Sequence, residues 1–145
     1  MRLIFALALL GPVSSAAAEQ FPSSAGPLAV DTIARGLVHP WSLAFMPDGR
    51  MLVTERPGRM RIVRGGELSP PVAGVPKVFA QSQAGLMDVA LDRGFAENRT
   101  IYFCYNADAT GSVAVARARL DTGAAPRLDD VTAIFRQEGP PSRSG

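Results

Sequence analysis

The sequence of 145 residues contains very little cysteine, histidine or lysine. Cys104, His39 and Lys77 are the only residues of these types, and fourteen of the fifteen basic residues are arginines. One cysteine and one histidine exclude a Cys/His zinc site within the chain, and they leave Cys104 without an intrachain disulfide partner. Cys104 is therefore expected to be a small, buried apolar residue. The net charge is only +2 and no run of five basic residues occurs, which argues against binding to nucleic acid.

A long apolar run is also missing. The apolar stretch "LIFALALL" over 3–10 is much shorter than the roughly 20 residues that a membrane span needs. Arg2 precedes this stretch and the small residues Ala16–Ala18 follow it, which is the pattern of a secretory signal peptide. We predict a signal peptide over 1–18, no membrane span after its cleavage, and a periplasmic or secreted location in a bacterium. An uncleaved anchor is the alternative, which the short run disfavours.

Glycine and proline, in contrast, are frequent, with 14 and 12 residues. Glycine and proline residues at this frequency favour short strands joined by tight turns. After a flexible leader over 19–27, the pattern predicts strands at Leu28–Ala34, Trp41–Met46, Met51–Glu55 and Arg59–Arg64. The compact apolar stretch Trp41–Met46 is expected to be buried on both faces, with Trp41 as a core anchor. Asp48-Gly49 and Pro57-Gly58 supply the turns.

The same pattern then recurs. Strands are predicted at Val75–Ala80, Leu86–Leu91, Thr100–Tyr105 and Gly111–Leu120, and Val131–Phe135 is expected to begin a third unit. The turn at Arg93-Gly94 follows the turn at Asp48-Gly49 by 45 residues. A unit of four strands that repeats every ~40–50 residues is typical of a β-propeller blade. We predict an all-β fold in which 28–145 form about two blades and the start of a third, as part of a larger protein. A two-sheet sandwich is the alternative.

Two blocks of the sequence resemble a known family. "GLVHPWSLAFMPDGRMLVTERPGRMRIV" (36–63) and "QAGLMDVALDRGFAENRTIYFCY" (83–105) are similar to the first two blades of the soluble pyrroloquinoline quinone (PQQ)-dependent sugar dehydrogenases, the glucose/sorbosone and aldose sugar dehydrogenases. The resemblance implies a six-bladed propeller that holds PQQ over its channel near a calcium ion. It also implies oxidation of an aldose at its anomeric carbon to a lactone, by hydride transfer to the quinone, with a quinone or cytochrome-like electron acceptor.

The resemblance assigns one substrate-binding residue to this chain. Gln83 falls where the family places a glutamine that contacts the sugar, and its amide can both donate and accept hydrogen bonds. The general-base histidine of the family belongs to a "His-x-Gly-x-Arg" segment, which we expect just beyond Gly145. His39 does not match that segment and is assigned a structural or surface role. The residues that hold PQQ and calcium belong mostly to later blades, so no cofactor or metal ligand is assigned here.

Two alternative interpretations of the chain stay open. A non-catalytic periplasmic propeller could use the same blades for binding or as a scaffold, because propellers host many functions. A short protein could also complete its ring by self-association. Several charged residues are expected to have only local roles: Glu55 and Arg56 as a local ion pair, Arg59, Arg61, Arg117 and Arg119 on solvated strand faces, and Asp129 and Asp130 in a solvated loop.

Overall fold

The computed structural model describes residues 19–109 and 111–138, so the predicted signal peptide lies outside the described residues. The chain divides into two units after Thr32. In the first unit, β1 (Glu19–Phe21) and β2 (Leu28–Val30) form an antiparallel hairpin whose strands are fully exposed. The leader expected over 19–27 therefore includes a short strand, and the strand predicted over 28–34 ends at Val30.

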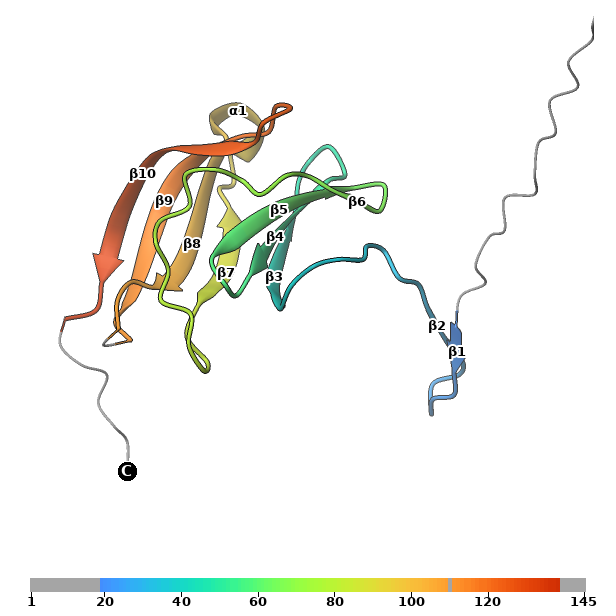
Figure 1. Ribbon diagram of the computed structural model, residues 1–145. Helices are drawn as coiled ribbons and strands as arrows, with labels where there is room; N and C mark the ends of the chain where they lie inside the picture. Colours follow the sequence, from blue (N-terminus) through green and yellow to red (C-terminus); the bar gives the residue numbers. More distant parts are fainter. Residues whose placement is uncertain (1–18, 110, 139–145) are drawn as a thin grey trace, which may run out of the picture. The chain divides into compact units, whose positions relative to one another are not determined.

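The second unit contains two four-stranded antiparallel sheets, and in both the strands follow one another in chain order (Figure 1). The first sheet consists of β3 (Pro40–Phe45), β4 (Met51–Glu55), β5 (Arg59–Arg64) and β6 (Glu67–Leu68). The second consists of β7 (Leu86–Leu91), β8 (Thr100–Asn106), β9 (Val113–Asp121) and β10 (Arg127–Arg136). One helical turn, α1 (Phe95–Asn98), joins β7 to β8. Two four-stranded units are present as predicted, but β6 takes the place expected for Leu28–Ala34 in the first, and β10 takes the place expected for Val75–Ala80 in the second.

The last predicted strand belongs to the second sheet. Val131–Phe135 was expected to begin a third unit, but it lies within β10, which pairs antiparallel with β9. Leu128 pairs with Leu120 in this ladder, and both side chains are buried. A register shift between Asp129 and Thr132 then carries the strand onward along β9. Burial of this leucine pair keeps the strand on the second sheet, so the expectation for Val131–Phe135 was wrong.

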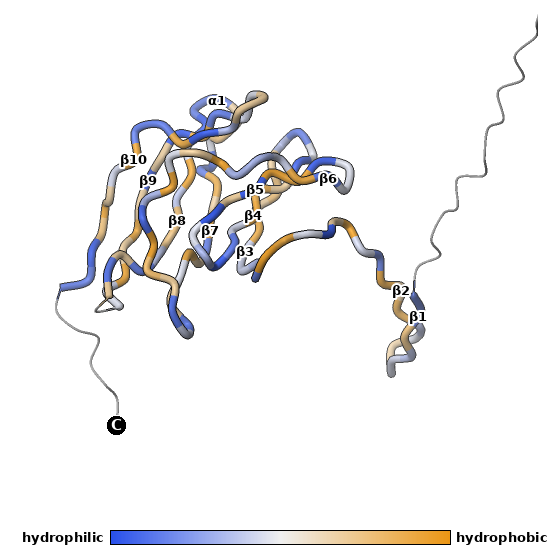
Figure 2. Tube along the Cα trace, viewed as in Figure 1, coloured by the Kyte–Doolittle hydropathy of each residue, from blue (hydrophilic) through white to orange (hydrophobic). Residues whose placement is uncertain are grey.

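The two sheets pack face to face and bury one shared core. From the first sheet it takes Leu52, Met60 and Ile62, and from the second it takes Leu86, Val89, Ile101, Phe103, Tyr105 and Leu120. Ala114, Ala116 and Ala118 lie on the same face of β9, where their small side chains let the facing layer approach. Figure 2 shows apolar residues on the strands of both sheets. The first strands of the two sheets, β3 and β7, lie in contact, as neighbouring innermost strands do in a propeller.

The connection from β6 to β7 lies against the core without forming a regular strand. Val75–Ala80 was predicted as a strand, but this segment is irregular, and the connection makes only an isolated bridge from Ala73 to Arg127. Pro76 supplies no backbone N–H for a ladder, which explains the difference. Val72 is nevertheless buried in the core. The connection thus crosses from the first sheet to the second and packs apolar side chains against the shared core.

The strand β3 is less buried than expected. Trp41, Leu43 and Phe45 are 47%, 49% and 72% exposed, so the expectations of a strand buried on both faces and of Trp41 as a core anchor were wrong. The strand is at the edge of its sheet, and only its other face, which carries Ala44, packs on the core. No described element of the second unit covers the row of Trp41, Leu43 and Phe45. Within 19–109 and 111–138, no helix is long and apolar enough to cross a membrane.

Candidate functional site

The predicted sugar-contacting residue lies on a short exposed loop immediately before β7. The loop comprises Gln81–Gly85 (the 81–85 loop). It closes on itself through a hydrogen bond that the Ala84 N–H donates to the Gln81 carbonyl, with an N···O distance of 2.8 Å. Ser82 takes a positive φ of 51°, an unusual backbone conformation for a residue other than glycine. The Gln83 side chain is exposed, and within the described residues it neither donates nor accepts a hydrogen bond. Its amide is thus available to a ligand.

On one side, the 81–85 loop is held by Arg56, the residue that follows β4. The Arg56 guanidinium donates a hydrogen bond to the Ser82 carbonyl. The Arg56 carbonyl in turn accepts a hydrogen bond from the Leu86 N–H, with an N···O distance of 2.9 Å. Gly85 approaches so closely that a Cβ built there would lie 2.4 Å from the Arg56 carbonyl oxygen. The first blade therefore supports the loop that the second blade presents.

On the other side, the loop is held by Asn106 at the end of β8. The Gly85 N–H donates to the Asn106 side-chain oxygen at 2.9 Å, and the Asn106 N–H donates back to the Gly85 carbonyl at 3.0 Å. The side-chain amide of Asn106 also donates to the Gly111 carbonyl at 2.8 Å. Asn106 is only 7% exposed, so these bonds satisfy polar groups that are removed from water.

A second link near this loop joins β3 and β4 of the first blade to β7 of the second. The Thr54 hydroxyl on β4 donates to the Met87 carbonyl on β7 at an O···O distance of 2.7 Å. The same hydroxyl oxygen accepts a hydrogen bond from the Ser42 N–H on β3 at 3.1 Å. Thr54 is fully buried. These bonds connect β3, β4 and β7 and set the relative position of the strands from which the loop projects.

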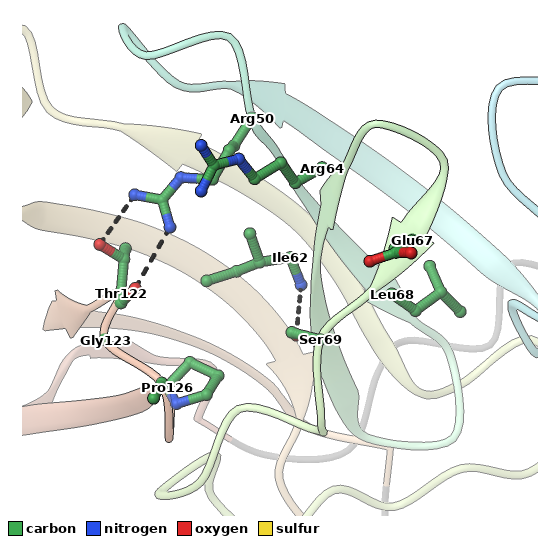
Figure 3. Close-up of a pocket in the computed structure, with 10 residues that line it drawn as sticks. Arg50, Ile62, Arg64, Glu67, Leu68, Ser69, Thr122, Gly123 and Pro126 are labelled. Carbon is green, nitrogen blue, oxygen red and sulfur yellow. Dashed lines mark hydrogen bonds between the residues drawn. The ribbon is translucent and has the colours of Figure 1, made fainter. Parts of the chain in front are cut away.

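An open pocket of about 380 Å³ lies at the opposite end of β4, between the β3–β4 turn, β5–β6 and the β9–β10 turn (Figure 3). The Arg50 guanidinium crosses it and donates to the Thr122 carbonyl at 3.2 Å and to the Thr122 hydroxyl at 2.9 Å. Arg50 also forms an ion pair with Asp48 at 2.6 Å. Since Arg50 precedes β4 and Arg56 follows it, this pocket is distinct from the 81–85 loop. Its side chains join the two blades at their other end.

The remaining charged residues behave in part as expected. Glu55 is buried and accepts hydrogen bonds from the Val38 N–H and from Arg59 Nε, so the expected local pair with Arg56 was wrong. The hairpin of β4 and β5 places Arg59 opposite Glu55, whereas Arg56 turns toward Ser82.

The predicted solvated strand faces are only partly confirmed. Arg117 and Arg119 are exposed, and Arg119 forms ion pairs with Asp129 and Asp130. Arg61 is only partly exposed, and its Nε is buried without a hydrogen-bond partner among the described residues. Cys104 is a free thiol of intermediate exposure rather than a buried one, because it lies on the face of β8 that points away from the core.

His39 lies at the entrance to β3. It is exposed and has a positive φ of 48°. Its carbonyl accepts a hydrogen bond from the Arg56 N–H at 2.9 Å. The structural or surface role predicted for His39 stays a prediction, and its backbone contributes to the support of Arg56.

The pKa values of two aspartates, the exposed Asp48 and the partly exposed Asp92, are lowered. Hydrogen bonds and charge from Arg50 hold the pKa of Asp48 below its ordinary value of 3.8. The side-chain amide of Asn98, followed by the Gly94 N–H, lowers the pKa of Asp92. Both carboxylates accept hydrogen bonds within turns between strands. Their lowered pKa values therefore result from the hydrogen bonds of these turns and do not mark a binding site.

The fold and the two supported blades define this chain as part of a β-propeller. A family model described as Glucose / Sorbosone dehydrogenase matches residues 37–145. The chain belongs to that family, the soluble PQQ-dependent sugar dehydrogenases. The predicted resemblance is thus confirmed.

Two relatives match most of this chain but only part of their own length. The protein slr1608 of Synechocystis is 46% identical over an alignment of 111 residues, and the match covers 69% of this chain and 26% of the relative. The aldose sugar dehydrogenase YliI of Escherichia coli is 40% identical over an alignment of 113 residues, and the match covers 74% of this chain and 30% of the relative. The chain therefore spans less than a third of the length of these relatives.

Solved structures give the same result. A glucose dehydrogenase superposes with a TM-score of 0.72 at 42% identity, covering 77% of this chain and 36% of the other. The PQQ-bound form of the aldose sugar dehydrogenase from Streptomyces coelicolor superposes with a TM-score of 0.66 at 26% identity, covering 74% of this chain and 33% of the other. The propeller family predicted from the repeat is confirmed.

The described residues alone do not fit PQQ or calcium. The carboxylates of PQQ favour arginine forks, yet Arg56, the arginine beside Gln83, is already bonded to the Ser82 carbonyl. Among the described residues, no group of three or more His, Cys, Asp or Glu side chains could hold a metal ion. The assignment of the cofactor-holding residues to later blades stays a prediction.

Sequence reasoning missed Asn106 and the bonding role of Arg56. The signal for Asn106 was available, because a single asparagine ends the otherwise apolar strand "TIYFCYN". Its partners lie 21 residues earlier at Gly85 and five residues later at Gly111. No local pattern connects positions with such unequal spacing.

Proposed function

We propose that the full-length protein is a PQQ-dependent dehydrogenase of aldose sugars, and that this part of it presents Gln83 to the sugar. Membership of the family supports the reaction class. The names of the E. coli and S. coelicolor relatives support the aldose substrate and PQQ. The sequence resemblance adds a calcium ion and a quinone or cytochrome-like electron acceptor to the proposal, and the predicted signal peptide adds a periplasmic or secreted location.

The observation that carries the role of Gln83 is its placement. Its side chain is exposed at the start of β7, the strand of the second sheet that lies against β3 of the first. Innermost strands line the channel of a propeller, where propellers bind ligands. The Gln83 amide can accept a hydrogen bond from one sugar hydroxyl and donate to another. In this role it binds and orients the substrate without taking part in proton transfer.

The test uses the full-length protein, reconstituted with PQQ and calcium, in a dye-reduction assay with a panel of aldoses. We expect sugar-dependent reduction, and we expect Gln83→Ala to raise KM by about tenfold because one or two hydrogen bonds to the sugar are lost. Gln81→Ala is the matched control, because Gln81 is an exposed glutamine of the same loop. Absence of sugar-dependent reduction would contradict the enzyme and favour the non-catalytic propeller.

A further inference from the structure

Asn106 lies beside the 81–85 loop and is hydrogen-bonded through both its backbone and its side chain. Its backbone and side chain together take part in four hydrogen bonds, with Phe79, Gly85 and Gly111. The Phe79 N–H donates to the Asn106 carbonyl at 2.9 Å, just before the loop begins. Asn106 thus contacts the chain both before and at the end of the loop. The segment between these contacts carries Gln83.

The side-chain amide of Asn106 joins two loops. Its oxygen accepts from the Gly85 N–H and its nitrogen donates to the Gly111 carbonyl. An aspartate would keep the acceptor but lose the donor, and a leucine of similar shape would lose both. Asn106 is 7% exposed and Gly85 is buried, so water cannot readily replace the bond between them. The amide therefore makes a specific contribution that a residue of similar size cannot supply.

We propose that Asn106 is a positioning residue for substrate binding, which sets the conformation of the 81–85 loop and thereby the direction of the Gln83 amide. This inference rests on the proposed role of Gln83. The Gly85 N–H is two residues from Gln83, so a rotated peptide at Gly85 displaces the side chain that meets the sugar. Arg56 holds the loop from the first blade, and Asn106 holds it from the second.

The test compares Asn106→Leu, Asn106→Asp and Gln83→Ala in the full-length protein reconstituted with PQQ and calcium. Hydrogen exchange by mass spectrometry reports the protection of the peptide over 81–86, and steady-state kinetics report KM and kcat for the sugar. We expect Asn106→Leu to abolish protection of the Gly85 amide and to raise KM by about five- to tenfold, with a smaller change in kcat. Asn106→Asp, which keeps the acceptor for Gly85, is expected to lie between wild type and Asn106→Leu in both readouts.

The control is Tyr102→Phe, at the other end of β8. It removes the hydrogen bond from the Tyr102 hydroxyl to Asp92, and it should leave both the exchange over 81–86 and KM unchanged. A purely structural role of Asn106 would lower the melting temperature without a selective change in KM. If Asn106→Leu does not fold, the Asn106→Asp variant provides the test. Hydrogen exchange over 81–86 and a KM that both equal those of the wild-type protein in Asn106→Asp would overturn the inference.

Failure of the two proposals can be distinguished. If Gln83→Ala raises KM but the Asn106 variants do not, Asn106 has no positioning role. Unchanged exchange over 81–86 in the Asn106 variants overturns the inference whatever the kinetics show. If Gln83→Ala itself leaves KM unchanged, the proposed sugar contact is wrong, and with it the substrate-positioning role of Asn106.

Discussion

Gly85 lies directly against Arg56, and an added Cβ at residue 85 would be 2.4 Å from both the carbonyl oxygen and Cγ of Arg56. This approach brings the end of β4 in the first blade to the start of β7 in the second. It is stabilised by the hydrogen bond from the Leu86 N–H to the Arg56 carbonyl. The missing side chain at residue 85 is therefore a requirement of the contact between the blades.

Gly85→Ala tests this contact. The added methyl group must displace the backbone of Arg56, and overpacking of this kind costs about 1–3 kcal/mol of the free energy of unfolding. Denaturant unfolding of the variant measures the change. Gly123→Ala is the matched control, because the nearest atom to its Cβ is the end of the Asp121 side chain, at 3.3 Å. Equal stability of the two variants would show that the blades do not need a glycine at residue 85.

Thr54→Val tests the buried link between the blades. The substitution keeps the shape of the side chain but leaves the Met87 carbonyl and the Ser42 N–H without their partner. An unsatisfied buried polar group costs about 1–3 kcal/mol, so we expect a loss of stability in that range. Thr54→Ser retains the hydroxyl and should lie much closer to wild type. Thermal unfolding of both variants measures the difference, and a Val variant as stable as the Ser variant would contradict the role of the hydroxyl.

Asp48 and Asp92 predict a dependence of stability on acid pH. Their pKa values are lower in the folded chain than the ordinary value of 3.8, so the unfolded chain binds the proton more readily. Their contribution to stability is therefore present above pH 3.8 and is lost as the pH falls through the lowered pKa values. Asp48 is exposed and Asp92 is partly exposed, so solvent screening keeps the effect small.

Unfolding measured between pH 7 and pH 2 checks this expectation. Asp48→Asn and Asp92→Asn should each reduce the loss of stability at acid pH. Asp88→Asn serves as the control, since Asp88 is exposed on β7 and accepts no side-chain hydrogen bond within the described residues. An unaltered acid profile in both Asn variants would show that the turn hydrogen bonds are not linked to folding.

Much of the blade structure could be predicted from local patterns. The alternation of Met60 and Ile62 with Arg59 and Arg61 correctly predicted a strand with one face toward the core, because the period of a strand is two residues. The turn at Asp48-Gly49 was equally clear, since Gly49 takes the positive φ of 82° that such a turn requires.

Burial and strand allocation could not be predicted in this way. Trp41–Met46 is apolar on both faces, but only the face that meets β7 is covered within the described residues. Val131–Phe135 has the pattern of a strand in any sheet, and its pairing with Val115–Arg117 depends on residues more than a dozen positions away. Both expectations failed for the same reason, which is that a local pattern does not specify its neighbour.

By itself, the sequence determined the repeated strand–turn–strand units, the family, and the position of Gln83 before an inner strand, because these depend on side-chain period, turn chemistry and motif. Only the tertiary structure decided that Arg56 and Asn106 hold the loop of Gln83 from two different blades. The physical reason is that a hydrogen bond depends on distance in space, and the packing of the two sheets brings Arg56 to Ser82, which is 26 positions away in the chain.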